Sequence, residues 1–481
     1  MTDTTEASAA APPVPPIDLT DPGRYHVVGV GGPGMSAVAI ALAEMGHQVS
    51  GSDLRDLPVL DRVRAAGIEV HVGHAASHVV GVDAVTASTA VPETNLELQA
   101  ARERGVTVLR RAGMLAAICA QARSIGVAGT HGKTTTSSML MLMLAEAGLK
   151  PGFVIGGDVA DVGAGAQWTG SEWFVVEADE SDGTHLELPL HATVLTNVEA
   201  DHLDHYGSFD AIVAGFERYL RQIPGPKALC FDDPVCVELA DRLGSDAGIV
   251  GYGTSARADV RAVELRAERG SFRFGVERHG ESIGEVRLPL RGVHNVLNAC
   301  GALALALDLG VPAQAAIAAL ERFGGVARRF DLRGEHGGAT FIDDYAHLPS
   351  EIGAVLTAAR DSGDGWRRLV AVFQPNRFNR MAVLWPEYAD AFEAADLVVL
   401  TDIYSSGTQV LPGVTGKLVV NAVLDKHPET HVVWLPHRAD LVEYLARSVV
   451  AGDACISMGC GDVASLPDEV IARRLELEAR G

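Results

Sequence analysis

The chain has 481 residues, of which 62 are Asp or Glu and 39 are Lys or Arg, so its formal net charge is −23. This charge argues against a general nucleic-acid binder, which needs a basic face to neutralise phosphates. Hydrophobic residues make up 47% and charged residues 21%, a composition typical of a folded protein rather than a disordered one. At about 150 residues per domain, the length favours about three domains.

Membrane insertion and secretion are not expected. The longest strongly apolar run, Met139–Ala145, is far shorter than the roughly 20 residues that cross a bilayer. Residues 1–23 are Thr-, Ala- and Pro-rich at their start and lack the basic and apolar parts of a secretory signal, so we expect a disordered tail. The six cysteines form no CxxC pair, which favours buried free thiols in a reducing compartment. We therefore expect a cytoplasmic protein.

Short apolar strands alternate with glycine turns and helices, a pattern typical of α/β domains with parallel sheets. The first unit, 24–112, has predicted strands at 25–30, 48–53, 84–88 and 106–109, and a helix at 35–45. The second, 113–325, has predicted strands at 124–129, 173–177 and 193–197, and helices at 139–147 and 295–309. The third, 326–481, has predicted strands at 340–344, 369–373, 397–400, 432–435 and 454–458, and a helix at 352–360. Three consecutive α/β domains agree with the length.

A glycine-rich turn follows the first strand and opens a helix, with the sequence Gly29-Val-Gly31-Gly32-Pro-Gly34. Glycines there let the backbone approach a pyrophosphate, and the helix N-terminus stabilises its charge. Asp53 ends the second strand about 20 residues on, where an acid can hold a ribose. The pattern indicates a nucleotide without saying which; a tight turn in any α/β domain is the alternative.

The second unit opens with a strand, a loop and a helix that carry Gly129-Thr130-His131-Gly132-Lys133-Thr134-Thr135-Thr136. In such a loop the backbone N–H groups cradle phosphate oxygens, the lysine faces the β- and γ-phosphates, and a hydroxyl binds Mg²⁺. Val127 stands where the strict GxxxxGK pattern has its first glycine. The run still predicts a P-loop for ATP; a phosphate-free turn is the alternative.

Acidic residues follow two apolar strands of the second unit, as Glu177-Ala-Asp179-Glu180-Ser-Asp182 and Glu199-Ala-Asp201-His202-Leu-Asp204-His205. The carboxyl ends of neighbouring parallel strands meet at one edge of a sheet, and carboxylates there can hold Mg²⁺ against ATP. Glu177 is the preferred ligand because it directly ends its strand. Solvated loop faces are the alternative.

The third unit has polar residues after two of its strands. Asp343-Asp344-Tyr345-Ala-His347 follows one, and Arg377 and Arg380 follow another. Arginine binds carboxylates and phosphates bidentately. Taken alone, these are ordinary helix-start and surface residues.

These features, in this order, resemble the Mur ligase family, ATP-dependent enzymes that build the peptide stem of bacterial peptidoglycan. His294-Asn-Val-Leu-Asn298 and Arg328-Arg-Phe330 add to the resemblance, which extends from Tyr25 to Gly461. It implies a Rossmann-like N-terminal domain that holds the UDP of a sugar substrate and a P-loop ATPase-like central domain that binds Mg²⁺ and ATP. It also implies a Rossmann-like C-terminal domain that brings the amino acid.

The resemblance further implies that L-alanine is joined to the lactoyl carboxylate of UDP-N-acetylmuramate through an acyl phosphate. The implied sugar-nucleotide contacts are Gly31, Gly32, Gly34, Met35, Ser36 and Asp53. The implied ATP contacts are Gly129, Thr130, His131, Gly132, Lys133, Thr134, Thr135, Asn295 and Arg329, and the implied Mg²⁺ ligands are Thr134, Glu177 and His202. The implied sugar and alanine site has Tyr345, His347, Asn376, Arg377 and Arg380, with catalytic roles for Lys133, His347, Arg377 and Arg380.

Particular positions separate this chain from other members of the family. Other branches have a carbamylated lysine shortly after the metal histidine, whereas no lysine lies between His205 and Pro226, which fits the alanine-adding branch. Leu348 and Asn376 stand where members usually have histidine.

Three alternatives remain open at this point. One is a recycling ligase of the same family that attaches a preformed peptide to UDP-N-acetylmuramate. Another is an NAD-dependent oxidoreductase built on Gly29–Asp53, which leaves the P-loop and the acidic strand ends unexplained. The third is a P-loop module that uses nucleotide binding to switch or drive a partner protein without ligation. It leaves the first glycine turn and the arginines of the third unit unexplained.

Overall fold

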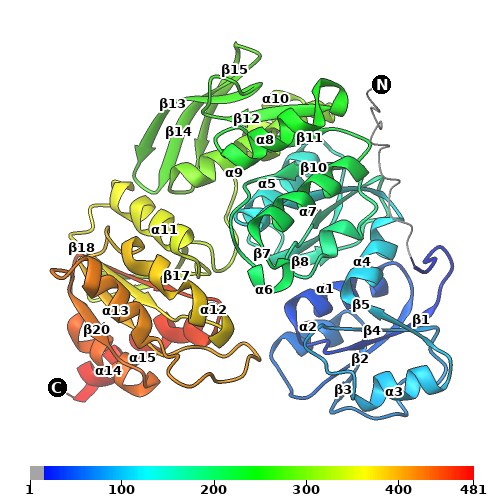
Figure 1. Ribbon diagram of the computed structural model, residues 1–481, viewed down its shortest axis with the longest axis horizontal. Helices are drawn as coiled ribbons and strands as arrows, with labels where there is room; N and C mark the ends of the chain where they lie inside the picture. Colours follow the sequence, from blue (N-terminus) through cyan, green and yellow to red (C-terminus); the bar gives the residue numbers. More distant parts are fainter. Residues whose placement is uncertain (1–15, 481) are drawn as a thin grey trace, which may run out of the picture. The chain divides into compact units, whose positions relative to one another are not determined.

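The structure is a computed structural model that describes residues 16–480 (Figure 1). It divides into two compact units, whose bounds differ from those of the three units expected from the sequence. The first runs to Glu264 and includes Phe274–Arg287 and Val296–Gly324; the second comprises Leu265–Arg273, Leu288–Asn295 and the chain from Gly325. Most of the predicted tail lies outside the described residues, and within its described part Leu19 is buried.

The first sheet is five-stranded and parallel, in the order β3-β2-β1-β4-β5. Its strands are β1 (Arg24–Val28), β2 (Gln48–Asp53), β3 (Glu69–Val72), β4 (Ala84–Ala87) and β5 (Thr107–Arg110). Its helices are α1 (Pro33–Glu44), α2 (Val59–Ala65), α3 (Leu96–Glu103) and α4 (Arg111–Cys119). The chain reverses direction across the sheet between β1 and β4, and ligands of such sheets bind at the carboxyl ends of the strands at this point.

The second sheet has ten strands, in the order β15-β14-β13-β12-β11-β10-β6-β9-β7-β8. They are β6 (Arg123–Ala128), β7 (Gly152–Val159), β8 (Ala164–Gln167), β9 (Trp173–Glu177), β10 (Ala192–Leu195), β11 (Lys227–Cys230), β12 (Ile249–Gly253), β13 (Val260–Glu268), β14 (Ser271–Arg278) and β15 (Glu281–Leu288). In the order in which they lie in the sheet, the strands from β13 to β7 pair in parallel, and β8 pairs antiparallel with β7 at one edge. Two-residue connections join β13 to β14 and β14 to β15, which is too short for a parallel connection and is typical of antiparallel neighbours.

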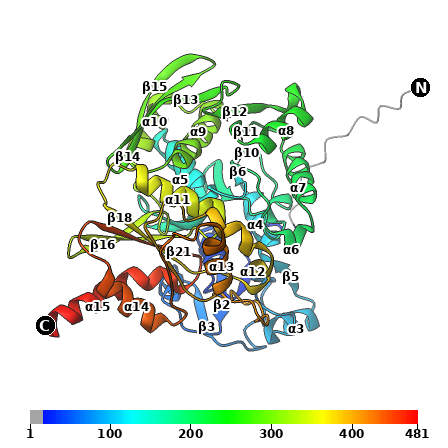
Figure 2. The ribbon, with the colours of Figure 1, turned by 60° about the vertical axis from the view of Figure 1, so that its left-hand side comes forward.

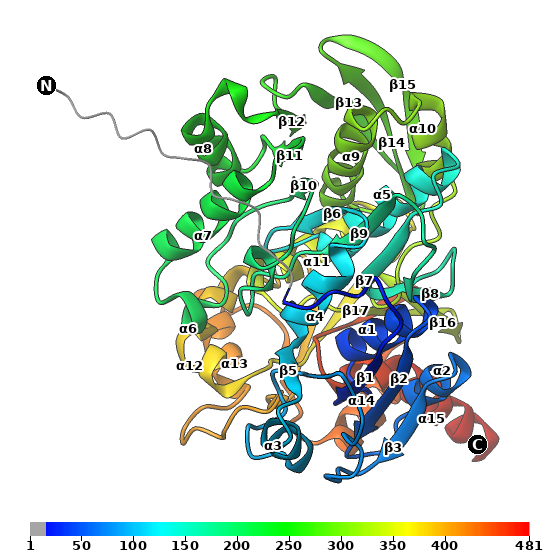
Figure 3. The ribbon, with the colours of Figure 1, turned by 90° about the vertical axis from the view of Figure 1, so that its right-hand side faces the viewer.

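Helices cover both faces of this second sheet (Figure 3). They are α5 (Lys133–Glu146), α6 (Leu203–Tyr206), α7 (Phe209–Gln222), α8 (Pro234–Leu243), α9 (Val293–Asp308) and α10 (Ala313–Glu321). The chain moves from β6 through α5 toward one edge, and from β10 through α7 and α8 toward the other. Because crossovers are right-handed, α5 lies on the opposite face from α7 and α8.

The third sheet has six strands in the order β16-β17-β21-β18-β19-β20, with β16 antiparallel to its neighbour and the rest parallel (Figure 2). They are β16 (Asp331–His336), β17 (Ala339–Asp344), β18 (Arg368–Phe373), β19 (Leu397–Leu400), β20 (Val432–Trp434) and β21 (Asp453–Met458). The helices are α11 (Pro349–Asp361), α12 (Phe378–Leu384), α13 (Lys417–Lys426), α14 (Arg438–Ser448) and α15 (Leu466–Arg480). Side chains of α11, α12 and α13 pack on one face and those of α14 and α15 on the other.

The predicted fold class is confirmed, since three α/β sheets follow one another along the chain. The predicted strand at 25–30 ends at Val28, because Gly29 turns the chain with φ +79°. The predicted helix at 139–147 begins earlier, at Lys133, because the polar residues Thr134–Ser138 are themselves buried in it. Strands β3, β7, β8, β11–β15 and β16 were not predicted. The boundaries at 112/113 and 325/326 remain a prediction.

The cysteine and membrane expectations can be compared with the described residues. All six cysteines are free, five of them buried and Cys460 partly so, as predicted. None of the helices within residues 16–480 has the length and apolar character that crossing a membrane requires.

Two glycines inside helices make a matched test of packing. A Cβ on Gly301 in α9 would lie 2.7 Å from the ring of the buried Tyr252, whereas one on Gly353 in α11 would meet nothing closer than 4.0 Å. Gly301→Ala should destabilise α9 by about 1–3 kcal/mol through overpacking. Gly353→Ala should stabilise α11 by up to about 1 kcal/mol, because alanine favours helix. Hydrogen exchange of the two helices measures both changes, and equal effects would contradict the packing at Gly301.

Candidate active site

The loop between β6 and α5 has a conformation that only glycine accommodates at two positions. Gly129 has φ +125°, and a Cβ there would lie 2.2 Å from Oγ1 of Thr196. Gly132 has φ +80°, and a Cβ there would lie 2.3 Å from Oδ1 of Asn298. Asn197, after β10, accepts hydrogen bonds from the N–H groups of Thr130 (3.0 Å) and His131 (2.8 Å). The neighbouring strand end therefore fixes the shape of the loop.

Lys133 begins α5, and its ammonium group lies among oxygens. Nζ donates to Gly129 O at 2.6 Å and to Oε2 of Glu180 at 2.9 Å. Burial lowers the pKa of Lys133, but Glu180 and Asp179 outweigh it and hold the pKa above its usual value. The group therefore stays charged in the interior.

The predicted Mg²⁺ ligands lie at the carboxyl ends of three adjacent strands. Thr134 follows β6, Glu177 ends β9, and His202 follows β10. Oε1 of Glu177 accepts a hydrogen bond of 2.8 Å from Gly156 N. His202 has φ +55°, a conformation costly for a side chain other than glycine and one that clusters at functional sites.

The imidazole of His202 faces two carboxylates. Its Nε2 lies 3.0 Å from Oδ2 of Asp201 and 3.9 Å from Oε1 of Glu180. Glu180 therefore lies between Lys133 and His202. The sequence shows Glu180 only as part of an acidic run. Its pairing with the P-loop lysine is visible only in the structure, so no separate role was predicted for it.

Arg111, at the start of α4, is a second cation that sequence reasoning missed. Its Nη2 lies 3.3 Å from Oδ2 of Asp179 and 3.3 Å from Oδ2 of Asp182. Burial raises the pKa of Asp179, but Lys133 and Arg111 outweigh it and lower the pKa to about 2. The only sequence signal was a basic pair directly after a predicted strand.

The first glycine turn is held by the acid predicted to bind a ribose. Oδ2 of Asp53 accepts a hydrogen bond of 2.9 Å from Gly31 N, and a Cβ on Gly31 would lie 2.7 Å from the same oxygen. The other predicted residues of this group, Gly32, Gly34, Met35 and Ser36, form the N-cap and first turn of α1. The turn and the acid thus form one local arrangement, and the ribose contact stays a prediction.

In the second unit, Tyr345 and His347 follow β17. The guanidinium groups of Arg328 and Arg329 lie 5.0 and 4.9 Å from the centre of the Tyr345 ring, within cation–π range. The ring of His347 meets that of Tyr345 edge-on at 5.5 Å. The backbone N–H of His347 donates a hydrogen bond of 2.8 Å to Oε2 of Glu351. A cluster of cations and aromatic rings therefore surrounds the end of this strand.

The predicted arginines follow β18, with Arg377 at the N-cap of α12 and Arg380 within the helix. Nη1 of Arg380 donates to Oδ1 of the buried Asn376 at 3.0 Å. Arg377 has φ +60° and donates its N–H to Tyr404 O at 2.9 Å. Leu348, where the family usually has histidine, is buried at the N-cap of α11.

Asn295, predicted to meet adenine, belongs to the second unit and precedes the point where α9 passes into the first. Its Nδ2 donates to Arg291 O at 2.8 Å and lies 3.1 Å from Nε2 of His294. In the first unit the predicted residues form two groups, one at the first glycine turn and one around Lys133. The predicted ATP contacts Asn295 and Arg329 belong to the second unit, and the assignments to ligands remain predictions.

Comparison with known proteins agrees with this arrangement. The description "Mur ligase family, catalytic domain" matches residues 24–123, "Mur ligase middle domain" matches 127–306, and "Mur ligase, glutamate ligase domain" matches 328–461. The UDP-N-acetylmuramate–L-alanine ligase of Acidothermus cellulolyticus is 46% identical over 460 residues, covering 95% of this chain and 96% of that protein.

Solved structures show the same similarity. The UDP-N-acetylmuramate-alanine ligase MurC from Thermotoga maritima matches with a TM-score of 0.79 at 28% identity, over 95% of this chain and 100% of that one. The murein peptide ligase mpl from Psychrobacter arcticus matches with a TM-score of 0.68 at 26% identity, over 94% and 98%. Because the family matches cover most of the chain and a relative is 46% identical along nearly its whole length, this protein belongs to the Mur ligase family.

Proposed function

We propose that this protein is an ATP-dependent ligase that joins L-alanine to the lactoyl carboxylate of UDP-N-acetylmuramate, a step of peptidoglycan precursor synthesis. The relative from Acidothermus cellulolyticus, 46% identical, has this activity in its name. The observation that carries the proposal is the charged, largely buried Lys133 at the end of a glycine loop, beside Glu180, which in turn lies near His202. This is an arrangement for anionic phosphates and the metal that accompanies them.

The reaction has two steps. A carboxylate oxygen of the lactoyl group attacks the γ-phosphorus of ATP, ADP leaves, and an acyl phosphate forms. The neutral amine of alanine then attacks the acyl carbon, phosphate leaves, and the amine gives up a proton. Both reactants of the first step are anions, so the site must neutralise charge. Lys133 supplies the fixed cation, and its raised pKa keeps it protonated at neutral pH.

ATP and Mg²⁺ are the cofactors of this proposal, and the donor set fits the metal. Thr134 offers a hydroxyl oxygen and Glu177 a carboxylate, the hard ligands that Mg²⁺ prefers. His202 lies against Asp201 and Glu180, which offer further oxygens. When bound, Mg²⁺ neutralises charge on the phosphates. The chain's own part is to hold these donors at the ends of adjacent strands.

The second unit carries the residues that we assign to the amino acid. Alanine is small, so its pocket needs a carboxylate clamp and little room. Arg377 and Arg380 can provide a bidentate clamp. The hydrogen bond from Arg380 to Asn376 orients that guanidinium, and the buried Leu348 offers no hydrogen bond.

Lys133→Ala should lower phosphate release by at least about a hundredfold at saturating ATP, because the fixed cation of the phosphate site is lost. Lys417→Ala, at an exposed helix position, is the matched control and should leave the rate unchanged. Circular dichroism checks that both variants fold. A rate near that of the wild type for a folded Lys133→Ala protein would contradict the P-loop assignment.

Glu177→Gln and His202→Ala should each raise the Mg²⁺ concentration needed for half-maximal activity by about tenfold, since each removes a predicted ligand. Glu187→Gln, at an exposed position just before Leu188, serves as the control. Titration of phosphate release with MgCl₂ measures the effect. An unchanged Mg²⁺ requirement in both site variants would show that these residues only order the loops.

Arg377→Lys should raise KM for alanine sharply with little change in KM for ATP, because an ammonium cannot reproduce the planar fork. Asn376→His should be tolerated within about 1–2 kcal/mol of transition-state stabilisation, since both residues can hydrogen-bond to their neighbours. Arg447→Lys on the surface is the control.

Steady-state constants for L-alanine, L-serine, glycine and L-alanyl peptides test the substrate itself. We expect L-alanine to be preferred. A preference for any of the others by more than about tenfold, roughly 1.4 kcal/mol, would overturn the alanine assignment and leave the ligase chemistry intact. A preference for the peptides would identify a recycling ligase.

A further inference from the structure

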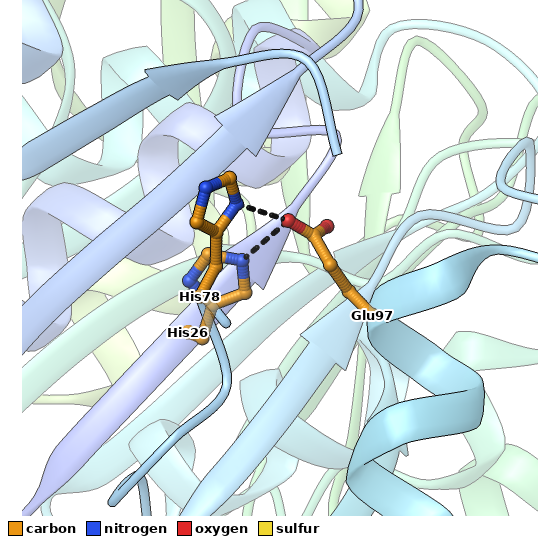
Figure 4. A group of neighbouring side chains, drawn as sticks. All are labelled: His26, His78 and Glu97. Carbon is orange, nitrogen blue, oxygen red and sulfur yellow. Dashed lines mark hydrogen bonds and ion pairs between the residues drawn. The ribbon is translucent and has the colours of Figure 1, made fainter. Parts of the chain in front are cut away.

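A buried carboxylate in the first sheet is surrounded by histidines, away from every residue assigned above to ATP or to the amino acid. Figure 4 shows Glu97 with His26 and His78. His26 lies in the middle of β1, His78 in the segment between β3 and β4, and Glu97 in the first turn of α3. The side chains of His26 and Glu97 are 0% exposed and that of His78 is 17% exposed. Three separate segments therefore converge on one point inside the protein.

The two oxygens of Glu97 have different surroundings. Oε2 accepts hydrogen bonds from Oγ of Ser52 at 2.6 Å and lies 2.8 Å from Nδ1 of His74. Oε1 lies 2.6 Å from Nδ1 of His78 and 3.5 Å from Nε2 of His26. Burial raises the pKa of Glu97, but the interactions of its carboxylate with His26, Ser52 and His78 outweigh it and lower the pKa to about 2. Oε1 is thus a charged oxygen that faces two imidazole nitrogens.

His26 has one ring nitrogen satisfied and one without a hydrogen bond. Nδ1 lies 2.8 Å from Oγ of Ser50, whereas Nε2 is fully buried, makes no hydrogen bond and points at Glu97. When Nδ1 carries the proton and donates it to Ser50, the lone pair of Nε2 faces a carboxylate oxygen. Two lone pairs that face each other in the interior need a proton or a metal cation between them. Metal-bound histidines usually donate the N–H of the far ring nitrogen to an oxygen atom, and Oγ of Ser50 offers such an oxygen to Nδ1 of His26.

We propose that His26, His78 and Glu97 bind a divalent transition metal of the zinc class. Their ligand atoms, two imidazole nitrogens and one carboxylate oxygen, all lie within 4.8 Å of one another. Around a tetrahedral Zn²⁺ with bonds of about 2.0–2.1 Å, ligand atoms are about 3.3 Å apart. The 3.5 Å from His26 to Glu97 already fits this spacing, and the 2.6 Å from His78 must lengthen by less than an ångström as the ion replaces the proton.

The rest of the cluster suits such an ion. The ring of His71 stacks on that of His78 at 3.9 Å and 8°, which fixes its plane. Two neutral imidazoles and one carboxylate leave a bound dication with a single net positive charge, and a water can complete a tetrahedral set. The ion would join β1, α3 and the segment before β4. The site is independent of the proposed ligase activity.

Metal binding by the untagged full-length protein tests the proposal. The protein is stripped with a chelator, returned to excess Mg²⁺ and titrated with Co²⁺, whose visible spectrum reports nitrogen ligands and tetrahedral geometry, and then with Zn²⁺. We expect one equivalent of Co²⁺ per chain, its displacement by Zn²⁺, and a rise in the thermal midpoint. No saturable Co²⁺ or Zn²⁺ binding would overturn the proposal and leave a cluster held by protons alone.

Variants assign the site. His78→Gln and His26→Gln keep a hydrogen-bonding side chain near Glu97 but remove a metal ligand, so each should weaken Co²⁺ binding by at least about tenfold. Asp390, Glu393 and His427 form another group whose possible ligand atoms converge, near the surface, and His427→Gln is the matched control. It should bind Co²⁺ like the wild type. Loss of binding in His427→Gln with retention in the other two variants would overturn the proposal, whichever variants fold well.

Discussion

The ammonium group of Lys133 is the charge on which the carboxyl edge of the second sheet depends. It lies 2.9 Å from Glu180, and Asp179 adds to the field that keeps it protonated. Loss of one partner of such a buried pair costs about 3–5 kcal/mol, because the other charge stays buried and unpaired. In the proposed reaction the phosphates compete with Glu180 for the same cation. Nucleotide binding would then exchange one anion at Lys133 for another, with His202 lying 3.9 Å from the carboxylate of Glu180.

The sheet topology makes this exchange possible. Strands β10, β6 and β9 are adjacent and parallel, so loops that are far apart in sequence leave the sheet at one edge. The glycine loop after β6 takes its shape from Asn197 after β10, and the lysine that follows takes its partner from the segment after β9. A chain that must place a loop, a cation and several carboxylates within hydrogen-bonding distance can do so from three strand ends without long connections.

The sequence alone predicted the features that depend on local chemistry. Apolar runs such as Trp173–Glu177 and Leu397–Leu400 are strands with the predicted bounds, because residues buried on both faces of a parallel sheet need no alternation. β13, with its alternating Val260–Glu268, was missed although its period of two residues was visible. The pairing of Lys133 with Glu180 and the contact of Arg111 with Asp179 join residues 47 and 68 positions apart, and no pattern in one sequence shows such contacts.

Glu97 and Glu180 pose the same physical problem and have different solutions. Each is a carboxylate with almost no exposed surface, and a charge in such a place requires opposite charge or several donors. Glu180 has the permanent charge of Lys133. Glu97 has imidazoles, which are neutral unless protonated, together with the hydroxyl of Ser52 and the backbone N–H of Ala75. Among the described residues, no side chain with a permanent charge lies against it, and one nearby nitrogen, Nε2 of His26, makes no hydrogen bond. A divalent ion supplies to Glu97 what the lysine supplies to Glu180, and this difference is the physical reason to look for metal in the first sheet.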